Sequence, residues 1–131
     1  MDRAGYEDYL RRFNARDYDG VMDYYGEAPK LDFFGVALRS RAEVKDFYRF
    51  LHRFVDEEIT LLAFAGSDEL AAAEVMVKIT GRAPLTRAML DERGLHGMHP
   101  IEPGQVIEME QFVHYRLAAD GRIDGVRCTL A

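Results

Sequence analysis

The stretch from Leu70 to Thr80 constrains the fold of this 131-residue chain most strongly. Apolar and polar side chains alternate along it, with Val75, Val77 and Ile79 set against Glu74, Met76 and Lys78. Such alternation predicts a β-strand with one apolar face and one polar face. A strand of this kind is typical of a mainly antiparallel sheet that buries one side and exposes the other.

Three amphipathic helices are predicted in the first 55 residues, because apolar side chains recur there at intervals of three and four. The apolar faces consist of Tyr6, Tyr9, Leu10 and Phe13, then Tyr18, Val21, Met22 and Tyr25, then Val44, Phe47, Tyr48, Leu51 and Val55. Asp17 is the predicted N-cap of the second helix. Ser40 and Glu43 have the spacing of a capping box, which places the start of the third helix.

Four further strands are predicted by β-type patterns between turn signals. They span Lys30–Val36, Glu58–Ala65, Gln105–Leu117 and Arg122–Leu130. Helices first and long strands afterwards indicate a single α+β domain, 1–131, with three N-terminal helices packed on the concave face of a strongly curved, mostly antiparallel sheet. Such a sheet encloses a conical cavity and leaves its outer face free, so we expect a homodimer through that face.

The segment 82–105 interrupts the strand pattern and contains Pro84, Pro100 and Pro103. Leu85–Leu90 within it has the composition of a short helix. Long connections inside compact domains are often functional lids, and a mobile hairpin extension is the other interpretation.

Charge and hydropathy argue against two classes of partner, nucleic acid and membranes. The formal net charge is −6 without a run of Lys or Arg, which argues against nucleic acid. No apolar stretch reaches membrane-spanning length, and the N-terminus lacks the apolar core of a signal peptide. The single cysteine, Cys128, fits a reducing compartment, so a cytoplasmic protein is expected.

Asp32 is the candidate catalytic base. It lies in the run Leu31-Asp32-Phe33-Phe34-Gly35, where a carboxylate is costly to bury unless it is paired or put to use. Tyr9 from the first helix would face it as a hydrogen-bond donor to a developing negative charge. The alternative interpretation is that Asp32 caps a turn and that the tyrosines are core aromatics.

The remaining candidate site residues are expected to form the wall of the cavity and to bind the substrate. They are Phe13, Tyr25, Tyr48, His52, Val75, Val77, Val113, Tyr115, Val126 and Cys128, with His99 closing over the substrate from 82–105. His114 alternates with Val113 and Tyr115 and is expected on the outer face. A shift of one residue in register would instead turn Glu108, Glu110 and His114 inward.

No cofactor or metal is expected. His96 and His99 are ligand types that suit zinc, but the Gly97 and Pro100 beside them indicate a loop without helical ligand spacing. The chain also lacks a phosphate-binding glycine loop, a nucleophile elbow and a dinucleotide fingerprint.

In the order and spacing of several motifs, the chain resembles the NTF2-like superfamily, in its SnoaL-like and steroid Δ-isomerase-like branch. These motifs are Tyr9–Asp17, Leu31–Gly35, Arg41–Tyr48, and Tyr115–Leu117 followed by Asp120–Ile123. The resemblance implies an NTF2-like cone. It also implies that Asp32 corresponds to the steroid isomerase base and Tyr9 to the oxyanion-binding tyrosine, with Tyr25 and Tyr48 as supports. Val113 stands where those enzymes carry a second, acidic donor.

Together these observations predict a cofactor-independent acid–base enzyme. Its substrate would be small, largely apolar and an oxygenated aromatic or cyclic compound, and its reaction of the retro-aldol lyase, isomerase or cyclase type. The alternative is a non-catalytic small-ligand-binding or dimerisation module of the same fold.

Overall fold

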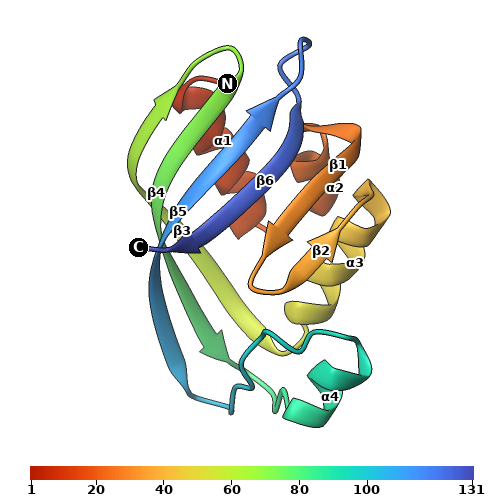
Figure 1. Ribbon diagram of the computed structural model, residues 1–131. Coiled ribbons are helices and arrows are strands. Elements are labelled where there is room, and N and C mark those ends of the chain that lie inside the picture. Colours follow the sequence, from red (N-terminus) through yellow and green to blue (C-terminus); the bar gives the residue numbers. More distant parts are fainter.

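Six strands form one curved, open sheet in a computed structural model that describes residues 1–131 (Figure 1). The strands are β1 (Tyr25–Phe33), β2 (Val36–Leu38), β3 (Val55–Gly66), β4 (Leu70–Gly81), β5 (Val106–Leu117) and β6 (Ile123–Leu130). Their order is β2-β1-β6-β5-β4-β3, and only the β1–β6 pair is parallel. The predicted α+β class with a mostly antiparallel curved sheet is therefore confirmed.

Three helices cover the concave side of this sheet, and a fourth lies apart at one end (Figure 1). They are α1 (Arg3–Asn14), α2 (Tyr18–Met22), α3 (Arg41–Leu51) and, at the end, α4 (Arg87–Glu92). No helix is both long enough and apolar enough to cross a membrane.

Local capping sets the starts of α1 and α3. The Asp2 side chain accepts a hydrogen bond from the Gly5 amide at 2.8 Å, and the Ser40 hydroxyl accepts one from the Glu43 amide at 3.1 Å. The Glu43 carboxylate in turn accepts a hydrogen bond from the Arg39 amide. The predicted caps of α2 and α3 and the predicted buried face of α1 are confirmed. The predicted face of α3 is confirmed at Val44, Phe47 and Leu51, whereas Val55 belongs to β3.

The second helix is shorter than its apolar pattern predicts. It ends at Met22, and Tyr25 is the first residue of β1 rather than the last of the helix. A turn at residues 23 and 24 separates the two elements, so Tyr25 reaches the core from the sheet.

The predicted strand Lys30–Val36 is in fact a hairpin. β1 turns at Phe34 and Gly35, which have φ angles of 47° and 75°, and β2 returns beside it with Phe33 opposite Val36. Two consecutive residues with positive φ make the tight turn that suits antiparallel strands. The sequence prediction missed this turn because Phe rarely adopts a left-handed conformation.

The register of β4 and β5 follows the predicted alternation. Val75 and Val77 are buried on the concave side, as are Val113 and Tyr115. Glu108, Glu110 and His114 are exposed on the outer face. Phe112 is a large apolar side chain on the same outer face, and it also stays exposed. The homodimer through this face stays a prediction.

The segment 82–105 packs firmly on one end of the sheet. Leu85 and Ile101 exchange two backbone hydrogen bonds of 3.0 Å, and both side chains are buried together with Leu90. Its short helix, α4, begins two residues later than predicted. Gly97 lies against the β1–β2 turn, where a Cβ atom on Gly97 would come within 2.2 Å of the Phe34 carbonyl oxygen. Only glycine permits this close approach.

Candidate active site

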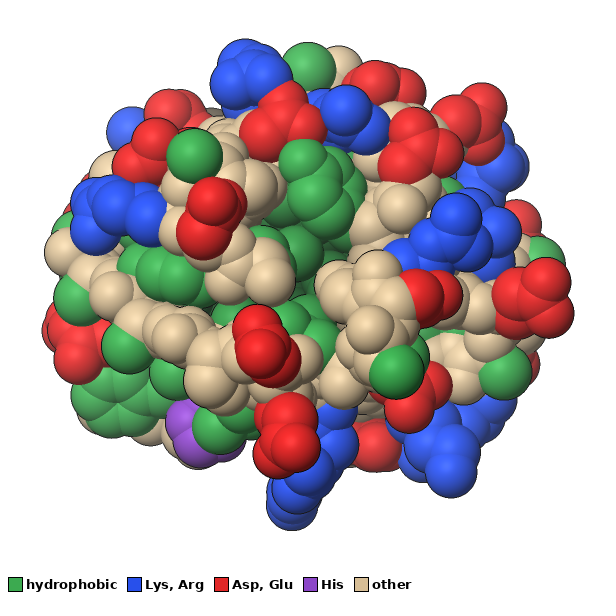
Figure 2. Space-filling model, turned by 90° about the horizontal axis from the view of Figure 1, so that it is seen from above, with side chains coloured by type: hydrophobic (Ala, Val, Ile, Leu, Met, Phe, Trp, Pro, Cys, Tyr) green, Lys and Arg blue, Asp and Glu red, His purple; other side chains and the backbone are tan.

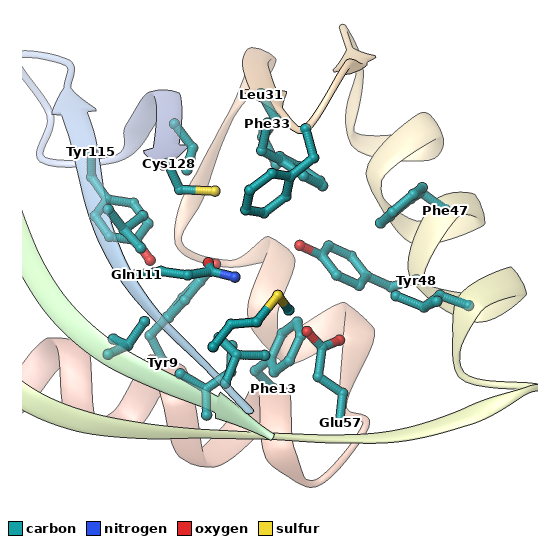
Figure 3. Close-up of a pocket in the computed structure, with 18 of the residues that line it drawn as sticks. Tyr9, Phe13, Leu31, Phe33, Phe47, Tyr48, Glu57, Gln111, Tyr115 and Cys128 are labelled. Atoms are coloured by element: carbon teal, nitrogen blue, oxygen red, sulfur yellow. The ribbon is translucent and has the colours of Figure 1, made fainter. Parts of the chain in front are cut away.

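A cavity of about 130 Å³ lies between α1, α3 and the concave side of the sheet (Figure 3). We call it the inner chamber. Its lining is largely aromatic and aliphatic, as expected of a small-molecule site with a few polar groups. The lining side chains are those of Tyr6, Tyr9, Phe13, Tyr25, Leu31, Phe33, Phe34, Phe47, Tyr48, Leu51, Glu57, Ile59, Val75, Val77, Ile79, Met98, Met109, Gln111, Val113, Tyr115, Val126 and Cys128.

Four tyrosines at one side of the inner chamber form two pairs, in each of which the hydroxyl groups hydrogen-bond to each other. The Tyr9 and Tyr25 hydroxyls are 2.7 Å apart, and the Tyr6 and Tyr115 hydroxyls are 2.8 Å apart. Burial raises the pKa of Tyr9 to about 12. Burial is likewise the main cause that raises the pKa values of Tyr25 and Tyr115 well above their ordinary range. All four phenols are therefore neutral near pH 7 and serve as donors or acceptors.

Two polar groups point into the inner chamber without a partner in the protein. The Tyr48 hydroxyl and the Gln111 amide both extend toward its centre (Figure 3). Neither group makes a side-chain hydrogen bond, although Gln111 is a buried residue. Because no fully enclosed polar side-chain atom in the protein lacks a partner, these two groups must border the open space of the cavity. Burial, and then the negative charge of Glu57, raise the pKa of Tyr48 well above its ordinary range. Both groups are thus available to hydrogen-bond a bound molecule.

Glu57 from β3 is the carboxylate of the inner chamber. Its Oε1 lies 2.8 Å from Nε2 of His52, the C-cap residue of α3, and the two side chains are only 10% and 5% exposed. The other ring nitrogen of His52, Nδ1, lies 2.7 Å from the hydroxyl of Tyr18, a partly exposed residue. These contacts fix the orientation of the carboxylate and connect it to the protein surface.

The inner chamber also contains the only thiol of the chain. The Cys128 sulfur points into the cavity from β6 (Figure 3). Burial raises the pKa of this thiol to about 11, with a further contribution from the negative charge of Glu57. Cys128 is therefore a neutral wall residue near pH 7 rather than a nucleophile.

The sequence matches the model of the SnoaL-like domain over residues 6–126. The chain belongs to the SnoaL-like family. No curated protein matches the sequence.

Solved structures share the fold at low identity. A putative polyketide cyclase from Silicibacter sp. TM1040 is 22% identical with a TM-score of 0.73, covering 95% of this chain and 85% of its own. An LEH-like epoxide hydrolase from M. tuberculosis is 15% identical with a TM-score of 0.69, covering 95% and 78%. An NTF2-like protein of unknown function from Burkholderia pseudomallei K96243 is 13% identical with a TM-score of 0.71, covering 95% and 86%.

The SnoaL-like fold of this chain does not place Asp32 in the inner chamber, so the prediction that it faces the cavity is wrong. Its carboxylate is half exposed on the outer side of the sheet and lies 2.7 Å from Nη2 of Arg39. The neighbours Leu31 and Phe33 line the chamber, and alternation along β1 turns Asp32 the opposite way. Asp32 and Tyr9 therefore lie on opposite faces of the sheet.

Most of the other predicted site residues do line the inner chamber of this SnoaL-like protein. They are Tyr9, Phe13, Tyr25, Tyr48, Val75, Val77, Val113, Tyr115, Val126 and Cys128. His52 lies behind Glu57 rather than at the cavity surface. His99 is exposed and borders a second cavity under the segment 82–105.

Sequence reasoning missed Glu57 and Gln111, although each has a signal. Glu57 is two residues before Ile59 and therefore on the same face of β3, but the predicted strand began at Glu58. Gln111 precedes Val113 and Tyr115 at the same two-residue spacing on β5.

Charged side chains of both signs lie on the surface of this SnoaL-like protein, and the two histidines considered as zinc ligands, His96 and His99, are exposed there as well. Acidic and basic side chains are interspersed on the face shown in Figure 2, around a hollow in which hydrophobic side chains gather. No group of three or more His, Cys, Asp or Glu side chains is arranged to hold a metal ion. His96 instead lies 2.9 Å from the Asp91 carboxylate on the surface.

Proposed function

We propose that this SnoaL-like protein is a cofactor-independent acid–base enzyme in which Glu57 is the base. The substrate is small, largely apolar and an oxygenated aromatic or cyclic compound, and the reaction is of the retro-aldol lyase, isomerase or cyclase type. One observation carries the proposal: a carboxylate held by a buried histidine lies in the wall of a largely apolar cavity.

The chemistry follows from the groups around the inner chamber. Glu57 takes a proton from a carbon next to a carbonyl group, and the electron pair of that C–H bond moves onto the carbonyl oxygen as an enolate forms. In a retro-aldol cleavage Glu57 takes the proton of the β-hydroxyl group instead. The hydroxyl carbon then becomes a carbonyl, the adjacent C–C bond breaks, and its electron pair moves onto the carbonyl oxygen of the other fragment. The Tyr48 hydroxyl and the Gln111 amide then donate hydrogen bonds to that oxygen. Such preorganised donors contribute about 3–4 kcal/mol each in favourable sites. Glu57 returns the proton to another atom of the substrate or of its fragments.

His52 orients the base. If Nε2 donates to the Glu57 carboxylate, the neutral imidazole must accept at Nδ1, and the Tyr18 hydroxyl is the donor there. The carboxylate is thereby held with one oxygen toward His52 and the other free for the substrate. This is the geometry that a positioned general base requires.

The names of similar structures fit this class of reaction. One is described as a putative polyketide cyclase and another as an LEH-like epoxide hydrolase. Cyclisation and epoxide opening both need a positioned proton donor or acceptor in a shaped cavity. The Glu57 site supplies that acid–base function here.

The test measures proton abstraction directly. β-Tetralone, a small bicyclic aromatic ketone, is incubated with the protein in D2O, and deuterium incorporation at its acidic carbons is followed by mass spectrometry. We expect the wild type to accelerate exchange over buffer and Glu57→Gln to lose about a hundredfold or more of that rate. Glu58→Gln, which alters the exposed neighbouring carboxylate, is the matched control and should exchange like the wild type.

The pairing of four tyrosine hydroxyls favours a second candidate, a non-catalytic small-ligand-binding or dimerisation module. These four hydroxyl groups already have hydrogen-bond partners within the protein. Buried polar groups paired in this way are equally consistent with a pocket that binds a ligand without reacting with it. The same assay separates the two functions. A binding module would retain β-tetralone without exchanging its protons, and Glu57→Gln would change neither property.

A further inference from the structure

A second cavity, of about 190 Å³, lies under the segment 82–105, and we call it the outer chamber. Its walls include Leu85 and Ile101 from that segment, Val55 from β3, Ile107 from β5 and Leu130 from β6. The proposed function uses none of these side chains.

The two chambers share a wall. Five side chains line both cavities: Phe34, Leu51, Ile79, Met98 and Met109. Met98 comes from the segment 82–105, and Met109 from β5. Methionine is unbranched with several rotatable bonds, so these two side chains can move aside at low cost. Met98 and Met109 are therefore the side chains of the shared wall that can rotate most readily.

The chambers differ in polarity. The carboxylate, the unpartnered phenol and the unpartnered amide all belong to the inner chamber: Glu57, Tyr48 and Gln111. The only polar side chain of the outer chamber is His99, and it is exposed. A molecule that fills both chambers must therefore have a polar end and an apolar end.

The outer chamber is a built cavity rather than the gap beneath a loose loop. The Leu85–Ile101 hydrogen bonds and the fully buried Leu90 anchor the segment that covers it. The contact of Gly97 with the Phe34 carbonyl closes that cover against the β1–β2 turn. The Arg93 guanidinium, 3.9 Å from the centre of the Phe50 ring, fixes the segment to α3.

We propose that the ligand of this protein is elongated, with an oxygenated ring in the inner chamber and an alkyl or acyl tail in the outer chamber. The inference rests on the proposed function for the role of the inner chamber, and adds the substrate class. The side chains of Met98 and Met109 lie between the two chambers and rotate aside when the tail enters the outer chamber.

Calorimetric titration with para-alkylphenols tests the inference. Phenol, para-ethylphenol and para-hexylphenol share one hydroxyl head and differ only in the tail. Each buried methylene contributes about 0.8 kcal/mol, or roughly fourfold in affinity. We expect the dissociation constant of the wild type to fall at least about tenfold from para-ethylphenol to para-hexylphenol.

Two neighbouring substitutions locate the tail. Ile107→Phe fills the outer chamber and should weaken para-hexylphenol at least about fivefold while leaving para-ethylphenol within about twofold. Val106→Phe adds the same group on the opposite, exposed face of β5 and should change neither affinity. Retained para-ethylphenol binding shows that Ile107→Phe is folded.

The inference would be overturned by equal affinity of the wild type for the two alkylphenols, or by equal effects of the two substitutions. Failure of all the phenols to bind would also overturn it. Because proton exchange is measured separately, an exchange-active protein without a tail preference would reject the outer chamber and leave the proposed function standing. A tail preference without exchange would reject the enzyme and keep a binding protein.

Discussion

The Glu57 carboxylate and the His52 imidazole are 2.8 Å apart in a region where both side chains are almost fully enclosed. His52 ends α3 and Glu57 lies near the start of β3, so the contact spans only five residues of sequence. It converts a buried carboxylate, which is costly alone, into an oriented one. The orientation of the proposed base depends on this pair.

Removing His52 should destabilise the protein through Glu57. His52→Leu leaves the carboxylate without its partner, and we expect a loss of about 1–3 kcal/mol in the free energy of unfolding measured with urea. The double variant His52→Leu/Glu57→Leu should lose less than the sum of the two single variants, with a coupling of about 0.5–3 kcal/mol. Strict additivity would show that the two side chains do not interact.

The reactivity of the Cys128 thiol should depend on the charge of Glu57. Because that charge contributes to the raised pKa of the thiol, about 11, Glu57→Gln should increase the thiolate fraction. We expect methyl methanethiosulfonate to modify Cys128 several-fold faster in Glu57→Gln than in the wild type, and Glu58→Gln to react like the wild type. Cys128 is the only cysteine, so the total thiol signal is specific. Identical rates in all three proteins would contradict the shared cavity.

The buried tyrosines should make the protein sensitive to alkali. Burial raises the pKa of Tyr9 to about 12 and those of Tyr25, Tyr48 and Tyr115 well above their ordinary range, whereas in the unfolded chain they ionise near pH 10. Above about pH 10 the unfolded state binds fewer protons than the folded state, so stability falls by about 1.4 kcal/mol per pH unit for each such tyrosine.

The corresponding measurement follows phenolate absorbance and circular dichroism together during an alkaline titration. We expect the stability to be fully present below about pH 10 and the buried phenols to ionise only as the fold is lost. Ionisation of all the tyrosines near pH 10 with the fold intact would contradict their burial.

Much of the fold could be predicted from periodicity alone. The faces of α1 and α3 and the alternation of β4 and β5 record which side chains are buried, so cavity residues such as Val75 and Val113 follow from the sequence. The β1–β2 hairpin could not be predicted, because its turn places Phe34 at a positive φ that Phe seldom adopts.

The error at Asp32 has a simple physical cause. An aromatic run around a carboxylate suggests burial, but a strand sends alternate residues to opposite faces, and Leu31 and Phe33 take the inner one. The same alternation identifies Glu57, because it lies two residues before Ile59 on β3 and therefore on the same inner face. The partnership with His52 depends on how α3 ends beside β3, and no local pattern records that approach.

A homodimer through the outer sheet face is testable through Phe112, which is 42% exposed at the centre of that face. A second copy that covers it would remove apolar surface from water. We expect sedimentation velocity to show a dimer for the wild type and a monomer for Phe112→Glu. Glu108→Gln, on the same face of β5, is the control and should stay dimeric. A monomeric wild type would rule the dimer out.

In the proposed mechanism the base of this SnoaL-like protein is Glu57 and not Asp32. The most direct test compares Glu57→Gln with Asp32→Asn in β-tetralone deuterium exchange, under identical conditions. We expect Glu57→Gln to lose the catalysed exchange and Asp32→Asn to exchange like the wild type. Loss of exchange in Asp32→Asn with full activity in Glu57→Gln would contradict this mechanism.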